Sequence, residues 1–400
     1  MRPLRIAMVT YSLRPRGGVV HAIEVGEALA RRGHQVELFG LGRAHEEFFR
    51  EPRVPSRVVR YEPIEAPFDE RIQAMMEGYR DGLAGMLGGF DVIHSQDCLS
   101  ANSALGLRDL GVIPHVIRTV HHVDAFTSRS LIACQNRSIL QPDALMCVSA
   151  PWVPRLAAQF GRTAWLVRNG VDTDRHRPPR NAAERRHDRA ATGFERHLTI
   201  LAIGGIEPRK GSLTLLDAFA ELRRLVPQQD PLLVVAGGAT LFDYRHEVEH
   251  FHSRVAELGL AERVRVLGSL PCSEFERLYR AADLFAFPSA VEGFGLAALE
   301  ALASGLPVAA SDLDVFRTFL EDGRSALLVP VGDSGALASA LARLARDSAA
   351  RERLRREGLQ VAARFSWDAA AVEHERVYEE ILPLLGATSG RVEVLSAPRG

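Results

Sequence analysis

Short apolar segments alternate with amphipathic segments along almost the whole 400-residue chain. Runs such as 5–12, 91–95 and 283–289 have the length and composition of buried strands, and the stretches between such runs have helical periodicity. Strands that alternate with helices form parallel sheets with helices on both faces. We therefore expect an α/β fold that contains two doubly wound, Rossmann-like domains.

The composition changes after Asn169, where the chain becomes rich in charge and proline until apolar strands resume at His197. A stretch of this kind is typical of a domain boundary. We expect a first domain over residues 1–172, with seven strands, and a second over residues 173–365, with six. A helical segment follows at 366–385, and the polar end, 386–400, reads as a mobile tail.

The segment PSAVEGFGLAALEALASGLPV, residues 288–308, places Glu292 and Glu300 eight positions apart around a glycine-rich turn between a strand and a helix. The turn and the first helical position are Gly293, Phe294, Gly295 and Leu296. Ligands of open α/β sheets bind at the carboxyl ends of the strands, and amides at a helix start can point at phosphate. Carboxylates accept hydrogen bonds from the paired hydroxyls of a hexose or a ribose. The segment therefore predicts a nucleotide-sugar site.

The chain has 48 arginines and a single lysine, Lys210, which lies in AIGGIEPRKGSLTLLDAF where another apolar strand turns into a helix. A compact ammonium on a flexible stem can follow a phosphate while a bond breaks, whereas a guanidinium prefers a fixed fork. Its position at the same edge as Glu292 predicts that Lys210 contacts a diphosphate.

Together, PSAVEGFGLAALEALASGLPV, GGIEPRKG, the early Gly17-Gly18 pair and the linker RNGVDTDRHRP resemble the retaining glycosyltransferases of family 4. The similarity extends from residue 4 to about residue 385. It implies the GT-B fold, in which two Rossmann-like domains face a cleft and a last helix, here 366–385, packs back on the first domain. It also implies an enzyme of the hexosyltransferase type (EC 2.4) that moves a sugar from a nucleoside diphosphate to a hydroxyl acceptor with retention.

The resemblance assigns roles to the charged residues of the second domain. Lys210 and Arg209 would stabilise the leaving diphosphate, Glu292 would bind a sugar hydroxyl, and Glu300 would bind the ribose. One departure concerns Gly205, because the family usually has arginine there in a pattern resembling G-R-x-x-x-x-K-G. Arg209, next to Lys210, could supply that charge.

Three places at strand ends of the first domain are candidates for contact with the donor or the acceptor. The amides of Gly17 and Gly18 precede a helix and could contact the phosphate or the transferred sugar. The resemblance aligns His121 with a histidine near that sugar, and His122 would replace it if the register shifted by one. His94, in DVIHSQD, is a weaker candidate with a role toward the acceptor.

Bulk properties limit the partners. A net charge of −1 provides no general attraction to nucleic acid or to anionic membranes. The four cysteines lack CxxC spacing, so neither zinc nor a disulfide framework is indicated. No run approaches about 18 apolar residues, so we expect a cytoplasmic protein. Lys210, Arg209 and the helix start after Glu292 would supply positive charge without a metal, so we expect no cofactor and no metal. Its donor would be a nucleotide sugar, and the acceptor, which could be a small molecule, a glycan or a lipid, is not identified.

Rival functions are left open at this point. A metal-dependent transferase would use an Asp-x-Asp motif, but Asp172-Thr173-Asp174 and Asp312-Leu313-Asp314 read better as turn or cap residues. A nucleotide-sugar epimerase or a non-catalytic binder of the same fold would have the same nucleotide site. A dehydrogenase is disfavoured because the first turn, SLRPRGGVVH, lacks G-x-G-x-x-G spacing.

Overall fold

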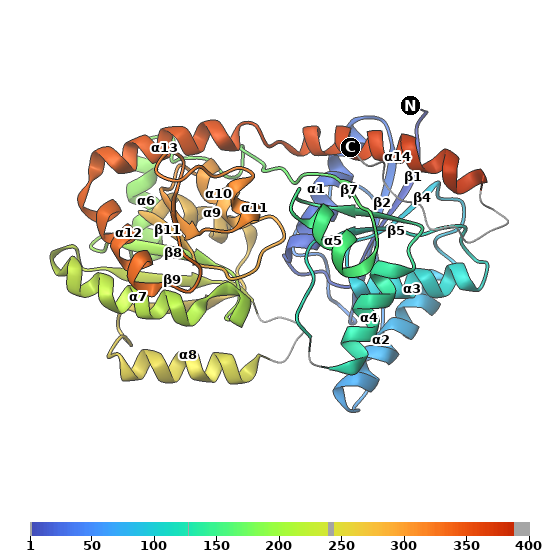
Figure 1. The fold of residues 1–400 in the computed structure, drawn as a ribbon, viewed down its shortest axis with the longest axis horizontal. Helices are drawn as coiled ribbons and strands as arrows, with labels where there is room; N and C mark the ends of the chain where they lie inside the picture. Colours follow the sequence, from blue (N-terminus) through green and yellow to red (C-terminus); the bar gives the residue numbers. More distant parts are fainter. Residues whose placement is uncertain (1, 127, 239–243, 388–400) are drawn as a thin grey trace. The chain divides into compact units, whose positions relative to one another are not determined.

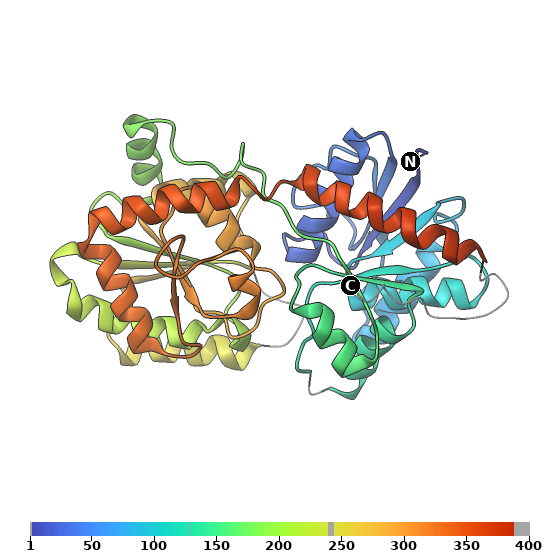
Figure 2. The same cartoon turned by 45° about the horizontal axis from the view of Figure 1, so that its top comes forward.

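The computed structural model describes residues 2–126, 128–238 and 244–387, and it divides into two compact units (Figures 1 and 2). The first unit contains residues 1–170 and 367–400, and the second contains residues 171–366. The predicted tail, 386–400, lies outside the described residues except for its first two positions, which end the last helix.

Within the described part of the first unit, seven parallel strands form one sheet in the order β3-β2-β1-β4-β5-β6-β7. The strands are β1 (Arg5–Thr10), β2 (Gln35–Gly42), β3 (Ser56–Arg60), β4 (Val92–Ser95), β5 (Ile117–Val120), β6 (Ala144–Cys147) and β7 (Trp165–Leu166). The strand order reverses beside β1, which pairs with both β2 and β4. Such a reversal opens a crevice at the carboxyl ends of the strands, where ligands bind.

The second unit repeats this arrangement. Its described residues form a six-stranded parallel sheet in the order β10-β9-β8-β11-β12-β13. The strands are β8 (Thr199–Ile203), β9 (Leu232–Ala236), β10 (Val264–Gly268), β11 (Leu284–Phe287), β12 (Val308–Ser311) and β13 (Leu327–Val329). The order reverses beside β8, where Leu284 of β11 pairs with Ile200. The predicted fold class and both predicted sets of strands are confirmed.

Helices cover both faces of each sheet, as Figure 1 shows. In the first unit they are α1 (Gly17–Arg31), α2 (Phe68–Leu83), α3 (Cys98–Asp109), α4 (Arg129–Leu140), α5 (Trp152–Phe160) and α14 (Trp367–Ala387). In the second they are α6 (Ala182–Thr192), α7 (Ser212–Leu225), α8 (Arg245–Glu257), α9 (Cys272–Ala281), α10 (Leu296–Ala303), α11 (Asp314–Arg317), α12 (Ser334–Arg346) and α13 (Ser348–Ala362), with short 3₁₀ turns η1 (Pro208–Lys210) and η2 (Pro227–Gln229). Strand residues such as Ile6, Val9, Ile200 and Leu233 are fully buried between these layers, which explains their near-continuous apolar sequence.

The last helix, α14, belongs to the first unit and packs beside α1. Glu375 of α14 accepts hydrogen bonds from Arg32 (2.8 and 2.7 Å) and lies 2.9 Å from Nε2 of His34. In the core, the hydroxyl of Tyr378 lies 2.7 Å from Nδ1 of His94 on β4. Polar contacts therefore fix the position of α14 at both its surface and its buried side.

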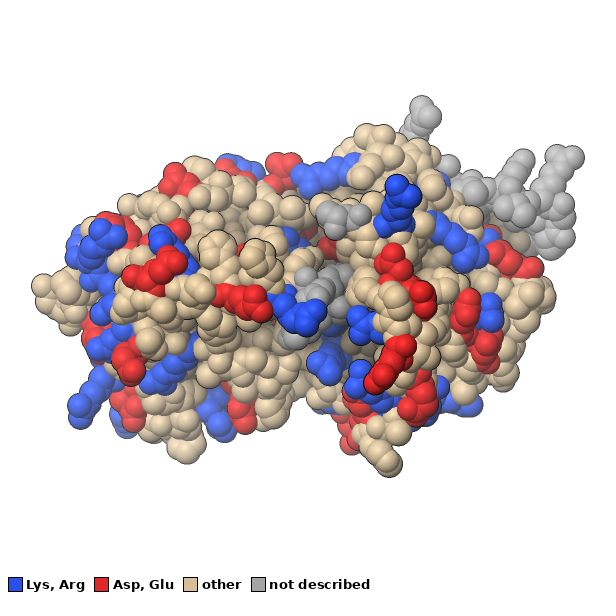
Figure 3. Space-filling view, turned by 90° about the horizontal axis from the view of Figure 1, so that it is seen from below, with Lys and Arg blue, Asp and Glu red and all other residues tan. Residues whose placement is uncertain are grey.

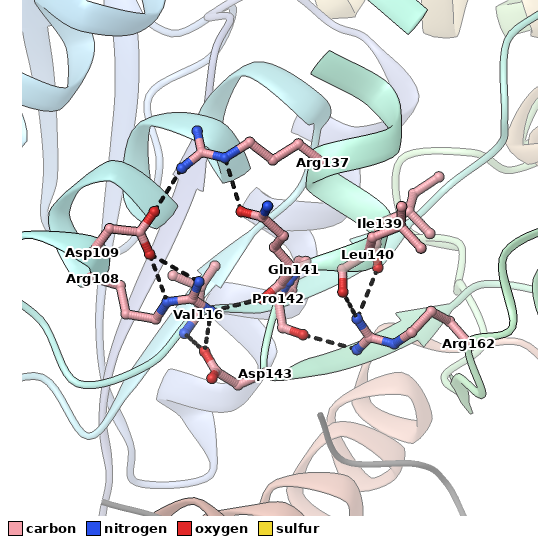
Figure 4. A network of polar contacts seen from close by, with 10 residues as sticks. All are labelled: Arg108, Asp109, Val116, Arg137, Ile139, Leu140, Gln141, Pro142, Asp143 and Arg162. Carbon is pink, nitrogen blue, oxygen red and sulfur yellow. Dashed lines mark hydrogen bonds and ion pairs between the residues drawn. The ribbon is translucent and has the colours of Figure 1, made fainter. Parts of the chain in front are cut away.

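Arginine has structural roles elsewhere in the first unit, as the network in Figure 4 shows. The guanidinium of Arg162 is buried and donates to the carbonyls of Ile139 (3.1 Å), Leu140 and Pro142 (2.8 Å) at the end of α4. Burial lowers the pKa of Arg162 to about 10. These bonds satisfy carbonyls that a helix end leaves unpaired. Most of the arginines need not be catalytic, since side chains like this one cap helices and join elements.

The surface has no strong charge bias on the face that Figure 3 shows, where basic and acidic side chains are interspersed. This pattern agrees with the formal net charge of −1. None of the helices in the described ranges is long and apolar enough to cross a bilayer.

Candidate functional site

Two loops meet at the carboxyl ends of the adjacent strands β8 and β11. The amide of Ala290, in the loop after β11, donates to the carbonyl of Arg209 in the loop after β8 (2.8 Å). Gly211, the N-cap of α7, has a φ of 66°, and a Cβ there would lie 2.1 Å from the carbonyl oxygen of Pro288. Only glycine permits this approach of the two backbones. The local sequence therefore fixes the two loops against each other.

Lys210 and Glu292 form an ion pair where these loops meet. The Lys210 ammonium donates to Oε1 of Glu292 at 2.5 Å, and the hydroxyl of Ser289 donates to the same oxygen at 3.0 Å. The ammonium also lies 5.0 Å from the centroid of the Phe287 ring. The Glu292 side chain is 9% exposed and that of Lys210 is 16% exposed, so both charges are largely removed from water. The single lysine and the first glutamate of the predicted site are thus in direct contact.

Burial and charge act in opposite directions on this pair. Burial lowers the pKa of Lys210, although the attraction of Glu292 opposes the change. Burial also raises the pKa of Glu292, but the charges of Lys210 and Arg209 outweigh that effect, so its pKa lies below the ordinary value. Glu292 is therefore charged near neutral pH, and its attraction favours the charged form of Lys210.

Arg209 lies in the same loop and contacts two carboxylates. Its Nε is 2.9 Å from Oε2 of the buried Glu207, and its Nη1 is 3.7 Å from Oε1 of Glu292. Gly205 has no room for a larger residue, because a Cβ there would lie 2.9 Å from the carbonyl oxygen of Gly238 and 3.0 Å from Glu207. The backbone is thus closed to a side chain where the resembling family has arginine, and Arg209 brings a guanidinium to the site from another position.

The glycine-rich turn before α10 is shaped by an aromatic cluster. Gly295 has a φ of 104°, and a Cβ there would lie 2.6 Å from the ring of Phe316. The Phe294 side chain is buried and its ring stacks on Phe319 with centroids 5.2 Å apart. Phe294 can therefore reach a ligand through its backbone and not through its ring. Helix α10 begins at Leu296, so the amides of this turn lie at a helix N-terminus that favours anions.

Glu300 lies one turn further along α10 and has neighbours that the sequence did not indicate. The hydroxyl of Tyr279 donates to its Oε2 at 2.8 Å, and Nε2 of His176 lies 3.8 Å from its Oε1. Tyr279 is buried, and the Glu300 side chain is 20% exposed. One carboxylate oxygen is therefore held by a hydroxyl, while the other faces an imidazole at a longer distance.

In the first unit, Gly18 lies against His121. Gly17 and Gly18 are the first two residues of α1, and His121 follows β5. A Cβ on Gly18 would lie 3.2 Å from the His121 ring, whereas a Cβ on Gly17 would meet nothing within 4 Å. Nε2 of His121 lies 3.1 Å from Oε1 of Gln96, which follows β4. Burial and the neighbouring His122 and Arg118 place the pKa of His121 well below its usual value, so the imidazole is neutral.

The other two histidine candidates have different surroundings. Nε2 of His122 lies 3.2 Å from Oδ2 of Asp124 in the loop after β5. His94 is fully buried, and its ring nitrogens lie 2.7 Å from the hydroxyls of Tyr378 and Thr119. With each ring nitrogen engaged and no exposed surface, His94 joins α14 to the sheet and does not face a ligand, so we assign it no role toward the acceptor.

The two Asp-x-Asp strings serve local structure. Asp172 accepts hydrogen bonds from the amides of Asp174 (3.0 Å) and Arg175 (3.2 Å), as in a turn. Asp312 pairs with Arg317 at 2.5 and 2.6 Å. Among the residues that the structure describes, no cluster of three or more His, Cys, Asp or Glu side chains could hold a metal ion.

Comparison with known proteins identifies the family. Residues 15–175 match the family model Glycosyltransferase Family 4, and residues 184–361 match Glycosyl transferases group 1. A D-inositol 3-phosphate glycosyltransferase of Corynebacterium jeikeium is 30% identical over 410 residues, covering 95% of this chain and 97% of that protein. The chain belongs to the group 1 glycosyltransferases of family 4.

Further relatives and solved structures agree with this family 4 membership. A phosphatidyl-myo-inositol mannosyltransferase of Mycobacterium leprae is 31% identical and covers 98% of this chain and all of that protein. The Anabaena protein HepE, solved with UDP and glucose, has a TM-score of 0.76 at 19% identity, covering 94% of this chain and 99% of that one. Sucrose-phosphate synthase from Thermosynechococcus elongatus also has a TM-score of 0.76, at 23% identity, covering 95% and 100%. The fold is therefore GT-B, and this family 4 glycosyltransferase is an enzyme of the hexosyltransferase type that uses a nucleotide sugar.

The site of this glycosyltransferase also contains residues that we did not select from the sequence. Glu207 and Ser289 lie within the quoted motifs, so their contacts with Arg209 and Glu292 could have been predicted from their closeness in the sequence. Gln96 lies in DVIHSQD, two residues after His94, but nothing in that segment indicated its contact with His121. Tyr279 had no signal, because it comes from a segment outside every motif and meets Glu300 only in the folded chain.

Proposed function

We propose that this enzyme transfers a hexose, with retention and without a metal ion, from a nucleoside diphosphate to a hydroxyl of its acceptor. Departure of the diphosphate places negative charge on the leaving oxygen, and positive groups aimed there lower the barrier. Lys210 and Arg209 supply that charge in the loop after β8. The single observation that supports this most is the 2.5 Å contact between the only lysine and Glu292 at the meeting point of two glycine-rich loops.

In this proposal Glu292 binds a hydroxyl of the transferred sugar and positions Lys210. Its Oε1 already accepts from Lys210 and Ser289, so the carboxylate is fixed before a ligand arrives. A carboxylate held in this way serves as an acceptor for sugar hydroxyls rather than as a nucleophile. Amides of Gly293 and Leu296, at the start of α10, would complete the contacts with phosphate.

Glu300 would bind the ribose through the oxygen that Tyr279 does not occupy. A ribose presents two neighbouring hydroxyls, and a carboxylate can accept from both. The hydroxyl of Tyr279 keeps the second oxygen in place.

Gly17, Gly18 and His121 would contact the donor from the first unit. Glycine at these two positions leaves the amides of the first turn of α1 open to a phosphate or a sugar. His121, neutral and within hydrogen-bond distance of Gln96, would bind a hydroxyl of the transferred sugar without adding charge. His122 has its own carboxylate neighbour and is not needed in this scheme.

The relatives suggest where a search for the acceptor should begin. Their names point to D-inositol 3-phosphate and to phosphatidyl-myo-inositol, so we propose a hydroxyl of an inositol phosphate or of its lipid as the first acceptor to try. The complex of HepE with UDP makes UDP the first nucleotide to try.

Thermal melting of the protein with UDP, GDP, ADP and TDP, each in EDTA, tests the donor side of the proposal. A ligand that binds only the folded state raises Tm according to its affinity. We expect a shift with one nucleotide, followed by product formation from its sugar with one of the two acceptors. A shift that appears only on addition of Mn²⁺ would favour metal-dependent binding, and no shift with any nucleotide would remove the assigned ligand from Lys210 and Glu292.

A further inference from the structure

A cavity of about 730 Å³ lies within the second unit, and one of its lining residues, Tyr279, also contacts Glu300 of the proposed donor site. Its lining includes Leu198, Asp283 and Pro307, each of which directly precedes a strand of the sheet. Because the strands are parallel, this edge is opposite to the one that carries Lys210 and Glu292. A volume of this size is typical of pockets for small molecules.

The side chains around the cavity are predominantly basic. The described residues that line it carry four guanidiniums and two carboxylates, which gives an excess of two positive charges. They are Arg185, Arg280, Arg351 and Arg355, with Asp283 and Glu352. Like charges held together around a hollow favour an anion inside it.

Neighbouring carboxylates do not neutralise this excess. Asp283 is shared by Arg185 (2.7 Å) and Arg189 (2.9 Å). Arg351 donates to the carbonyls of Leu344 and Ala345 at the end of α12. Each guanidinium thus has partial partners, and the local balance stays positive.

The other two guanidiniums of the cavity, those of Arg280 and Arg355, also have only partial partners. Asp188 is shared by Arg280 (2.7 Å) and Arg277 (3.7 Å). The pair of Arg355 with Glu352 is longer, at 3.3 Å, and the Glu352 side chain is 67% exposed. A pair so exposed is weak, so Arg355 can turn to another anion.

We propose that this cavity binds a small, soluble phosphate ester. A phosphate monoester carries close to two negative charges at neutral pH, which matches the excess of guanidinium. Arg185 and Arg355, with side chains 41% and 40% exposed, are accessible to bind the phosphate. Leu306 and Pro307 provide apolar wall for the carbon skeleton. The protein thus has a second ligand site besides that for its donor.

Calorimetric titration with glycerol 3-phosphate tests the site, with glycerol and malate as neutral and carboxylate probes. The informative variant is Arg355→Glu, and its matched control is Arg356→Glu, the next residue of α13, which is 64% exposed and does not line the cavity. We expect the wild type and Arg356→Glu to bind equally and Arg355→Glu to bind at least tenfold more weakly. Lys210→Ala should bind like the wild type, because the donor site is at the other edge of the sheet.

A second variant keeps the test decisive if the charge reversal disturbs folding. Arg355→Gln removes the charge without reversing it, so it should not lower Tm without ligand and should still weaken glycerol 3-phosphate several-fold. The proposal is overturned by equal binding to Arg355→Glu and Arg356→Glu, by loss of binding in Lys210→Ala, by tighter binding of malate, or by the absence of saturable binding to the wild type.

Discussion

The two sheets share a strand topology, but the carboxyl ends of their strands carry side chains of different chemistry. In the second unit the loops after β8 and β11 bring Lys210 and Arg209 against the buried Glu292. In the first unit Gly18, after β1, lies against His121, which follows β5 and whose imidazole burial keeps neutral. In our proposal the first arrangement balances a diphosphate, and the second allows close approach to an uncharged part of the donor.

Lowering the pH should have the largest effect, because it destabilises the first unit through its buried histidines. His374 of α14 is fully buried, and burial lowers its pKa to about 4, well below the value of about 6.5 in an unfolded chain. The unfolded state therefore binds the extra proton, and stability is full above pH 6.5 and falls as the pH falls toward 4. The loss from this residue is roughly 3 kcal/mol at pH 4. His21 and His94, whose rings lie 5.2 and 5.9 Å from that of His374, have pKa values lowered by burial and add to it.

Melting curves from pH 7.5 to 4.5 check this expectation, with His374→Phe as the comparison protein. The variant should lose less Tm on acidification than the wild type. The Lys210 and Glu292 pair behaves differently, because a carboxyl with a lowered pKa loses its stabilising charge only below its unfolded pKa of about 4.5. Parallel pH profiles for wild type and variant would contradict the role given to His374.

Removal of the Lys210 charge should have the next largest effect. In Lys210→Ala the leaving diphosphate loses a charge-assisted contact worth about 1.5–3 kcal/mol, so kcat should fall roughly ten- to hundredfold. Lys210→Arg should lose less kcat, because it keeps the positive charge. It should still be slower than the wild type, because a guanidinium fork cannot follow the phosphate as an ammonium does. Steady-state kinetics on folded variants are the measurement, and near-normal kcat in the alanine variant would remove Lys210 from the mechanism.

A smaller effect is expected where the first unit allows close approach. Gly18→Ala places a Cβ 3.2 Å from the His121 ring, which must then move, and kcat/KM should fall about tenfold. Gly17→Ala is the matched control for the contact with His121, since its Cβ would meet nothing within 4 Å, and its loss should be smaller than that of Gly18→Ala. Equal losses in the two variants would show that the contact with His121 is not what matters.

The smallest effect concerns the hydroxyl that holds Glu300. Tyr279→Phe removes a neutral donor at 2.8 Å from the carboxylate, so the Kd of the nucleotide should rise about two- to fivefold, with kcat unchanged. Glu300→Ala should weaken the nucleotide further, by about tenfold. Calorimetric titration with the nucleotide that shifts Tm measures both, and an unchanged Kd in Glu300→Ala would end the ribose assignment.

The fold and the second-unit site were largely predictable from the sequence. Buried strands are near-continuous apolar runs, so both sheets could be located, and Lys210 and Glu292 lie beside glycines that mark ligand-binding turns. The role of Phe294 was harder to predict, because the amino-acid sequence does not reveal that its ring stacks on Phe319.

Contacts that depend on distant segments could not be predicted. The resemblance predicted that residues 366–385 pack on the first domain, but neither it nor the pattern of α14 indicated that His374 lies beside His94. The arginines of the cavity come from α6, α9 and α13, and each of them alone reads as an ordinary surface charge. Tertiary packing, rather than local pattern, makes them a group.

The presence of a single lysine has a practical consequence for chemical labelling. Amine-directed reagents have only Lys210 and the N-terminal amine to react with in this chain. Because burial lowers the pKa of Lys210, a larger fraction of that amine is unprotonated than on an exposed lysine at the same pH. Mass analysis of the peptides of the acylated protein would separate Lys210 from the N-terminal amine, and protection of Lys210 by a bound nucleotide could be followed without any knowledge of the acceptor.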